Sequence, residues 1–281
     1  MTRPIGYPMP WTFAHPAAVL PLRRFCPWPL NFAALAIGAL TPDFGYYIEV
    51  AGLAVYAHMF TYSVLVCLPT GWLLLACFYL GRKPVWFLLP QPHRGLLEPL
   101  THRPAPLGAA ALLSATASII AGAWSHIAWD SFTHRTGLMV ARISLLQERV
   151  PGFGASDVRV YHVLQHLSTA AGIVLLVSAY RFYARREGVR PLFKYEREDK
   201  WRYVLFATIL LTSLAIAAPL SVTAATKPAG DLALRSLVFL IAIKGVSLFL
   251  ALVVAAAVVS HLARRRFDRD AQSRANLTRS T

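Results

Sequence analysis

Charged residues are scarce in this sequence, and acidic residues are the scarcest of them. Asp, Glu, Lys and Arg together make up 15% of the 281 residues, whereas soluble domains carry about 25%. Only 13 residues are acidic against 28 Lys and Arg, which gives a formal net charge of +15. The low charged fraction and a mean hydropathy of +0.49 argue against a soluble domain and indicate lipid as the solvent for much of the chain.

Cysteine is also rare. The three cysteines, Cys26, Cys67 and Cys77, have no paired spacing, which excludes a disulfide framework or a cysteine-based zinc site. We interpret them as apolar filler. A cleavable signal peptide is not expected either, because five prolines interrupt the first 21 residues and no small-residue cleavage site follows an apolar core.

Long hydrophobic runs are what the sequence has instead. A membrane-spanning helix needs about 20 mostly apolar residues, and five segments qualify: Tyr62–Leu80, Leu107–Trp129, Tyr161–Tyr183, Tyr203–Val222 and Leu234–Leu262. We therefore predict an all-α, multi-pass transmembrane helical bundle. Residues 1–262 form one integral-membrane domain in this prediction, with two C-terminal spans over 201–262 and a basic, disordered tail over 263–281.

Basic residues cluster in the loops between the predicted spans. Loops 81–107, 181–202 and 261–281 carry four, eight and six Lys and Arg, whereas 1–61, 129–161 and 223–231 carry three, four and one. The positive-inside rule places the richer side in the cytoplasm. We expect an integral-membrane protein with a cytoplasmic C-terminus, whose partner is the lipid bilayer and not nucleic acid.

The first fifty residues admit two interpretations. Phe13–Arg24 and Asn31–Thr41 are apolar but short, and two prolines in the intervening CPWPL segment disfavour a continuous helix. In one interpretation they form a helical hairpin, which returns Asp43 to the same end as His15. In the other, Leu30–Val50 is a sixth span that separates these two residues. We prefer the hairpin, because Asp43 within TPDFGYY is typical of a helix terminus.

The segment SHIAWDSFTHRT ends the second predicted span. His126, Asp130 and His134 recur there at every fourth residue, and the i, i+4 spacing of the first two is that of paired metal ligands on one helix face. His134 lies about 12 Å from His126 along a straight helix. One ion therefore cannot bind all three, so either two ions bind or the helix ends early, with Gly137 as the candidate terminator.

Other histidines and aspartates are expected at the same end of the bundle. His162 and His166 begin the third span, His58 precedes the first, Asp43 lies in the segment before His58, and His15 joins them in the hairpin interpretation. Imidazole and carboxylate together suit zinc, and also iron or manganese. We therefore predict a divalent metal site, with zinc favoured, at the outer face of the membrane.

Two further features are interpreted as unrelated to that site. His93 and His102 lie in a loop on the opposite side of the predicted bundle, where a solvated role is expected. Lys244 lies inside the last span and has no evident partner in the sequence. It is interpreted as a snorkelling or bundle-facing side chain.

Five motifs in a fixed order resemble a known family. PWTFAHPAAVLPLRR, GALTPDFGYY, AHMFTYSVLVCLPTGW, HIAWDSFTH and VLQHLST are similar to a bacterial integral-membrane family, domain of unknown function 4184, over roughly residues 9–260. More distantly, the order resembles YdjM-type membrane-bound metal-dependent hydrolases and zinc-dependent phospholipase C, which are helical and hold zinc with His and Asp from separate helices. The resemblance implies a location in the bacterial inner membrane, and a polar site made of His15, Asp43, His58, His126, Asp130, His134 and His166.

The resemblance has one departure and one functional implication. The last ligand helix of the phospholipase carries His and then Glu one turn later, whereas the matching segment here has His162 and His166 without a Glu. The implied activity is metal-dependent hydrolysis of a phosphoester, with a phospholipid as a candidate substrate and Asp43 and Asp130 as the catalytic carboxylates. The alternatives are a proton-coupled transporter, with polar residues through the membrane depth, and a non-catalytic, metal-stabilised membrane protein.

Overall fold

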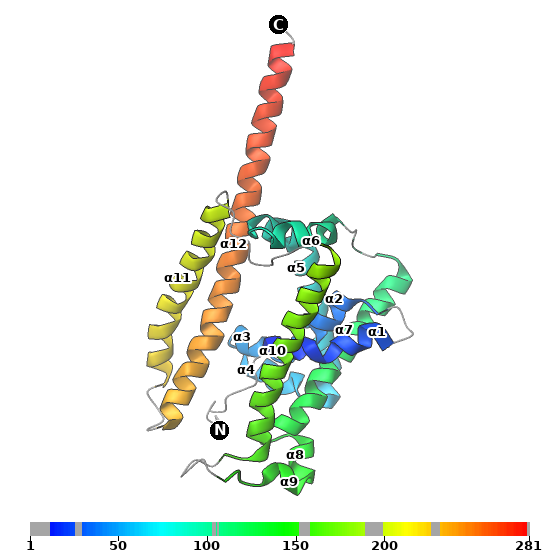
Figure 1. The fold of residues 1–281 in the computed structure, drawn as a ribbon, viewed down its shortest axis with the longest axis vertical. Coiled ribbons are helices and arrows are strands. Elements are labelled where there is room, and N and C mark those ends of the chain that lie inside the picture. The colour runs from blue at the N-terminus through cyan, green and yellow to red at the C-terminus, as the bar shows by residue number, and fades with distance from the viewer. Residues whose placement is uncertain are drawn as a thin grey trace.

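A computed structural model of the protein describes residues 12–25, 30–102, 105, 107–151, 158–188, 199–225 and 231–279. Within these ranges the regular elements are all helices, which confirms the all-α class. Five helices are long and apolar enough to cross a membrane. The chain is therefore a multi-pass helical bundle, as predicted (Figure 1).

The five predicted spans correspond to the five long helices. These are α5 (Phe60–Leu88), α7 (Ala109–Thr133), α10 (Val160–Arg186), α11 (Lys200–Ala225) and α12 (Asp231–Arg279). Most of them extend past the apolar stretch, because adding a residue to an existing helix costs little. The extension is longest in α12, which projects from the bundle in Figure 1 and is helical through 263–279, where the sequence predicted disorder. The Ala, Leu and Arg residues of that segment are strong helix formers.

Short helices make up the N-terminal part and the connections. The N-terminal elements are a 3₁₀ helix η1 (Thr12–Val19), α1 (Leu20–Phe25), α2 (Phe32–Gly38), α3 (Phe44–Tyr47) and α4 (Ala51–Ala57). None of these elements is long enough to cross a bilayer, so the structure supports the hairpin interpretation and not a sixth span over Leu30–Val50. Residues 26–29 of the CPWPL segment lie outside the described residues.

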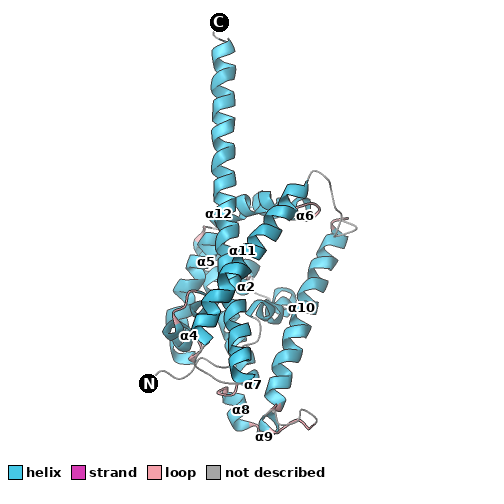
Figure 2. Cartoon of the chain, turned by 90° about the vertical axis from the view of Figure 1, so that its left-hand side faces the viewer, coloured by secondary structure: helices cyan, strands magenta, loops and turns pink. Residues whose placement is uncertain are grey.

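The connecting helices mark the two ends of the bundle. α6 (His93–His102) lies at one end, close to the start of α11, and α8 (Leu138–Arg142) and α9 (Ser144–Gln147) lie at the other. Figure 2 shows the same separation from the side. We call these the α6 end and the α8 end. The C-terminal end of α7, where the SHIAWDSFTHRT segment lies, faces the α8 end.

The central helix of the bundle is α7, which packs against η1, α2, α5 and α10. It is crossed most closely by α2. A Cβ atom added to Gly122 would lie 2.3 Å from the carbonyl oxygen of Leu35, and one added to Gly38 would lie 2.3 Å from that of Ile119. Glycine at both positions lets the two backbones touch. This contact fixes the C-terminal end of α2 one turn before His126.

Candidate metal centre

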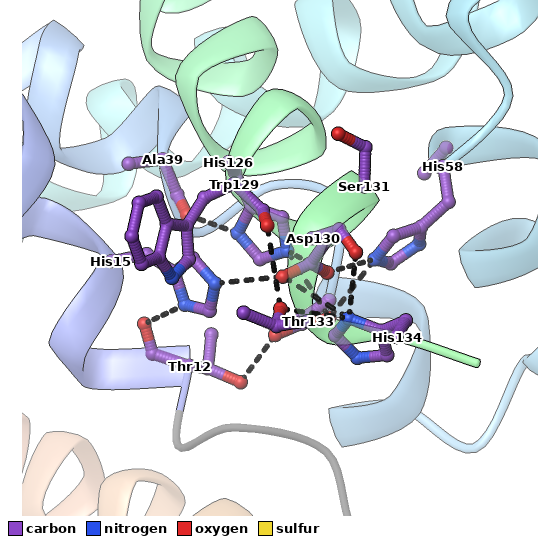
Figure 3. A network of polar contacts seen from close by, with 12 residues as sticks. Thr12, His15, Ala39, His58, His126, Trp129, Asp130, Ser131, Thr133 and His134 are labelled. Carbon is purple, nitrogen blue, oxygen red and sulfur yellow. Dashed lines mark hydrogen bonds and ion pairs between the residues drawn. The ribbon is translucent and has the colours of Figure 1, made fainter. Parts of the chain in front are cut away.

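Six of the seven predicted ligand residues come together at the C-terminal end of α7. They arrive from separate elements: His15 from η1, Asp43 from the start of α3, His58 from the end of α4, His126 and Asp130 from α7, and His134 from the residue after α7. Figure 3 shows five of them pointing toward one another. We call these six residues the His/Asp cluster.

The carboxylate of Asp130 is the centre of the cluster. Its Oδ1 lies 3.1 Å from Nε2 of His15 and 3.4 Å from Nδ1 of His134. Its Oδ2 lies 3.1 Å from Nε2 of His126 and 3.4 Å from Nε2 of His58. One buried carboxylate therefore contacts four imidazoles, which come from three different segments of the chain.

The second carboxylate, Asp43, faces two of the same rings. Its Oδ1 lies 3.4 Å from Nε2 of His58 and 3.7 Å from Nε2 of His126. Its Oδ2 accepts a hydrogen bond of 2.6 Å from the hydroxyl of Thr12. The Nε2 atoms of His58 and His126 thus each lie near an oxygen of both carboxylates.

His134 reaches the cluster because the helix ends before it. α7 ends at Thr133, and His134 has an extended backbone with φ −110° and ψ 141°. The alternative of an early helix end is therefore the one that the structure shows. The chain then turns back at Gly137, where an added Cβ atom would lie 2.3 Å from the carbonyl oxygen of Ser131. This turn leaves the His134 ring beside Asp130.

Backbone carbonyls orient three of the rings. Nδ1 of His126 lies 2.8 Å from the oxygen of Ala39, and Nδ1 of His58 lies 2.8 Å from that of Ala54. His15 makes the same contact with its own helix. Because a carbonyl only accepts hydrogen bonds, Nδ1 donates in these contacts, and Nε2 is the ring atom that faces the carboxylates; it offers a lone pair to a cation when the ring is neutral. Metal-binding histidines are typically oriented in this way.

Several buried atoms of the cluster have no hydrogen bond of good geometry. They are Oδ1 of Asp43, Nε2 of His58, Nε2 of His126, Oδ2 of Asp130 and Nε2 of His134. Unsatisfied buried polar atoms are costly and rare, yet the first four of these face one another across 3.1–3.7 Å. Donor atoms of two overlapping groups, His15 with Asp43 and His126, and His58 with His126 and Asp130, lie within 4.8 Å of one another. The cluster could therefore hold a metal ion.

Asp43 and His58 lie outside the spans, and the charges around them favour a cation within the cluster. Burial opposes ionisation of Asp43, but His126 and His58 lower its pKa to about 2. Burial also opposes protonation of His58, yet the close carboxylates of Asp130 and Asp43 raise the pKa of His58 to about 10. The two carboxylates thus attract positive charge to Nε2 of His58. A divalent cation would also neutralise the negative charge of these carboxylates, and its binding displaces protons from its ligands.

The cluster is partly exposed on one side. The side chains of His58 and His134 are 23% and 19% exposed, whereas those of His15, Asp43, His126 and Asp130 are 8% exposed or less. Figure 3 shows His58 and His134 on the same side of Asp130. We call this partly exposed side, formed by the rings of His58 and His134, the open side of the cluster.

His166, the seventh predicted residue, lies apart from the cluster and is exposed on α10. Gln165, one residue earlier, is buried, and Gly172 contacts Ala14 of η1. Gln165 and Gly172 are two turns apart, so they define the face of α10 that packs against η1. His166 is rotated by about 100° from Gln165, away from that face. The resemblance implied that His166 is a ligand, whereas the register of α10 turns this residue away from the cluster.

The other histidines that the sequence set aside lie elsewhere. Nδ1 of His93 lies 2.7 Å from the hydroxyl of Tyr180, and His102 is exposed on the same helix, α6. Both lie at the α6 end (Figure 1). Excluding this pair from the metal site, on the basis of the loop topology, agrees with the structure.

Sequence reasoning missed the groups that support the cluster from behind. Thr12, which holds Asp43, has no pattern that distinguishes it from any other threonine. The carbonyl oxygens of Ala39 and Ala54 leave no trace in the residue types, because every residue has one. They could be found only from the fold.

Comparison with known proteins gives one match. No curated protein matches the sequence significantly, and no solved structure does so. The more distant similarity to metal-dependent hydrolases and phospholipase C therefore stays a prediction. A family model described as a domain of unknown function, DUF4184, matches residues 9–260. Since this match covers most of the chain, the protein belongs to the DUF4184 family.

Proposed function

We propose that the His/Asp cluster is a divalent metal centre, and that zinc is its ion. The supporting observation is a set of four buried donor atoms, from Asp43, His58, His126 and Asp130, that face one another without hydrogen bonds of good geometry. The donor chemistry fits, since Nε2 of neutral imidazole and carboxylate oxygen are the ligands of zinc in sites without cysteine. His58, His126, Asp43 and Asp130 would hold the ion, and His15 completes the set through Asp130.

We further propose that the centre hydrolyses a phosphoester. When bound, a divalent cation polarises a phosphoryl oxygen and acidifies an attacking water. Asp43 offers Oδ1 to the cluster, because its Oδ2 is occupied by Thr12. His134 is suited to carry a proton: Nδ1 lies 3.4 Å from Oδ1 of Asp130, which orients the ring, and Nε2 is left without a hydrogen bond on the open side.

The proposed substrate is a lipid phosphoester. The cluster lies on α7, whose span is among the five that are apolar enough to cross the membrane. Large apolar side chains, Tyr56, Met59 and Phe60, are exposed directly around His58, and in a bilayer they face lipid. A headgroup could reach the open side of the cluster while its acyl chains stay in the membrane.

Metal content and hydrolysis test this function. Protein purified in detergent without added metal is expected to carry about one or more equivalents of zinc by elemental analysis, and to release phosphate or headgroup from phospholipid micelles. A metal content below about half an equivalent would contradict the metal centre. Bound zinc together with intact phospholipid after prolonged incubation would reject hydrolysis and favour a non-catalytic, metal-stabilised protein.

We also propose that the α8 end faces the periplasm of a bacterial inner membrane, as the loop charges predict. A single cysteine at Thr136, in a variant whose native cysteines are replaced by serine, reports this orientation. A membrane-impermeant maleimide is expected to label it in intact spheroplasts. Labelling that requires lysis would place the cluster on the cytoplasmic side instead.

A further inference from the structure

Lys244 is a cation inside the most apolar span, in the first third of Leu237–Arg266 of α12. Ionisable residues inside spans are costly and are usually retained for a function. Nζ of Lys244 forms an ion pair with Oε1 of Glu49, nearly 200 residues away in the sequence. One turn further along the same face of α12, the hydroxyl of Ser247 lies 2.8 Å from the carbonyl oxygen of Tyr47 and 2.9 Å from that of Ile243, and its one proton is shared between them.

Both contacts hold the turn between α3 and α4, which has an unusual residue at its key position. Val50 N–H bonds to the oxygen of Gly45 at 2.8 Å, and Glu49 N–H bonds to that of Tyr46 at 3.3 Å. This is the pattern of a Schellman motif, in which the left-handed position is usually glycine. Here Glu49 occupies it, with φ +59°. The backbone favours glycine at this position, so the side chain of Glu49 must serve another purpose.

The turn joins two members of the His/Asp cluster. Asp43 immediately precedes α3, and His58 immediately follows α4. Oδ1 of Asp43 and Nε2 of His58 lie 3.4 Å apart, so the path between them sets the spacing of two donor atoms. α3 has four residues and α4 has seven, and helices this short depend on tertiary contacts for their geometry.

We propose that Lys244 and Ser247 are positioning residues for the metal centre. Their contacts with Glu49 and Tyr47, which we call the clamp, fix the turn between Asp43 and His58. Helix α12 thereby influences the metal affinity of a centre to which it gives no ligand. This inference rests on the proposed metal centre. It explains why a lysine stands in this apolar span, and why glutamate replaces glycine at the turn.

Three variants test the clamp by zinc titration of metal-stripped protein in detergent. Lys244→Met is expected to raise the zinc dissociation constant about tenfold, the size of effect seen when groups behind metal ligands are removed. Glu49→Lys is expected to weaken binding at least as much. The double variant Glu49→Lys with Lys244→Glu restores the ion pair with reversed charges, and is expected to return to within about threefold of the wild type.

A further variant separates positioning from stability. Glu49→Gly removes the carboxylate but suits the left-handed backbone, so the thermal unfolding midpoint of the metal-stripped protein is expected to hold or rise while zinc affinity falls about tenfold. The control is Lys83→Met, which removes an exposed lysine from α5 and is expected to leave affinity unchanged.

The outcomes are distinguishable from a failure of the metal centre itself. If the wild type binds no zinc, the centre is rejected and the clamp with it. If the wild type binds zinc and Glu49→Gly and Lys244→Met bind it equally well, the clamp is rejected while the centre stands. A charge-reversed double variant no better than its single variants would also overturn the proposal, since the effect would then not come from the ion pair.

Discussion

Replacing Asp130 by asparagine is expected to abolish metal binding while leaving the bundle folded. The carboxylate of Asp130 contacts the rings of His15, His58, His126 and His134. Asparagine keeps the shape but removes the charge, and turns an NH₂ group toward nitrogen atoms whose lone pairs the cation needs. Since groups that only support ligands are worth about 10–100-fold in affinity, loss of this central carboxylate should weaken zinc binding by more than about 100-fold.

The consequence for stability gives a second measurement. A ligand at about 100 times its dissociation constant stabilises the folded state by about 2.7 kcal/mol, so a chelator should lower the thermal unfolding midpoint of the wild type. The midpoint of Asp130→Asn should not respond to the chelator. His166→Ala is the matched control, because His166 is exposed and outside the cluster, and it should retain both the metal and the chelator response.

Two results would contradict this view of Asp130. Full zinc occupancy in Asp130→Asn would show that the ion lies elsewhere. Loss of zinc in His166→Ala would show that α10 is turned differently, and would restore the ligand that the resemblance implied.

The spans could be predicted because their signal is local. Each is a run of about 20 apolar residues, and the bilayer requires such a run wherever a helix crosses. The hairpin before α5 has no such signal. Its short helices are set by contacts with α7, such as the close approach of Gly38 and Gly122, which involve residues more than 80 positions apart. Sequence periodicity therefore left two interpretations open.

The cluster could be predicted almost completely, for a reason that also explains the error. His and Asp are easily recognised beside apolar spans, and the loop charges assign each of them to one end of the bundle. His126, Asp130 and His134 needed only the i, i+4 rule and an early helix end. His166 lies at the same end of the bundle as the cluster but on another face of α10. The position of a residue along a helix does not give the rotation of that helix about its axis. Which face of α10 packs inward is decided by Gly172 against Ala14.

The close crossing of α2 and α7 predicts a large effect from one methyl group. A Cβ atom at Gly122 would lie 2.3 Å from the oxygen of Leu35 and 2.8 Å from the nitrogen of Ala39. Both are backbone atoms that cannot rotate away, so Gly122→Ala must push the helices apart. We expect a loss of about 2–3 kcal/mol in unfolding free energy from overpacking.

The same displacement should reach the metal centre. The oxygen of Ala39 accepts the hydrogen bond from Nδ1 of His126 at 2.8 Å, and Asp43 lies four residues further along the chain. Moving α2 away from α7 loosens the ring of His126 and shifts one carboxylate. Zinc affinity should therefore fall about tenfold or more in Gly122→Ala, as for other losses of the groups that orient ligands.

Gly81→Ala in α5 is the matched control, because a Cβ atom there meets nothing within 4 Å. In a helix, alanine in place of an uncrowded glycine stabilises by about 0.5–1 kcal/mol, so the two variants should change the thermal unfolding midpoint in opposite directions. If Gly122→Ala is as stable as Gly81→Ala, the helices do not cross in contact. If it is destabilised but binds zinc with wild-type affinity, His126 does not depend on α2 for its orientation.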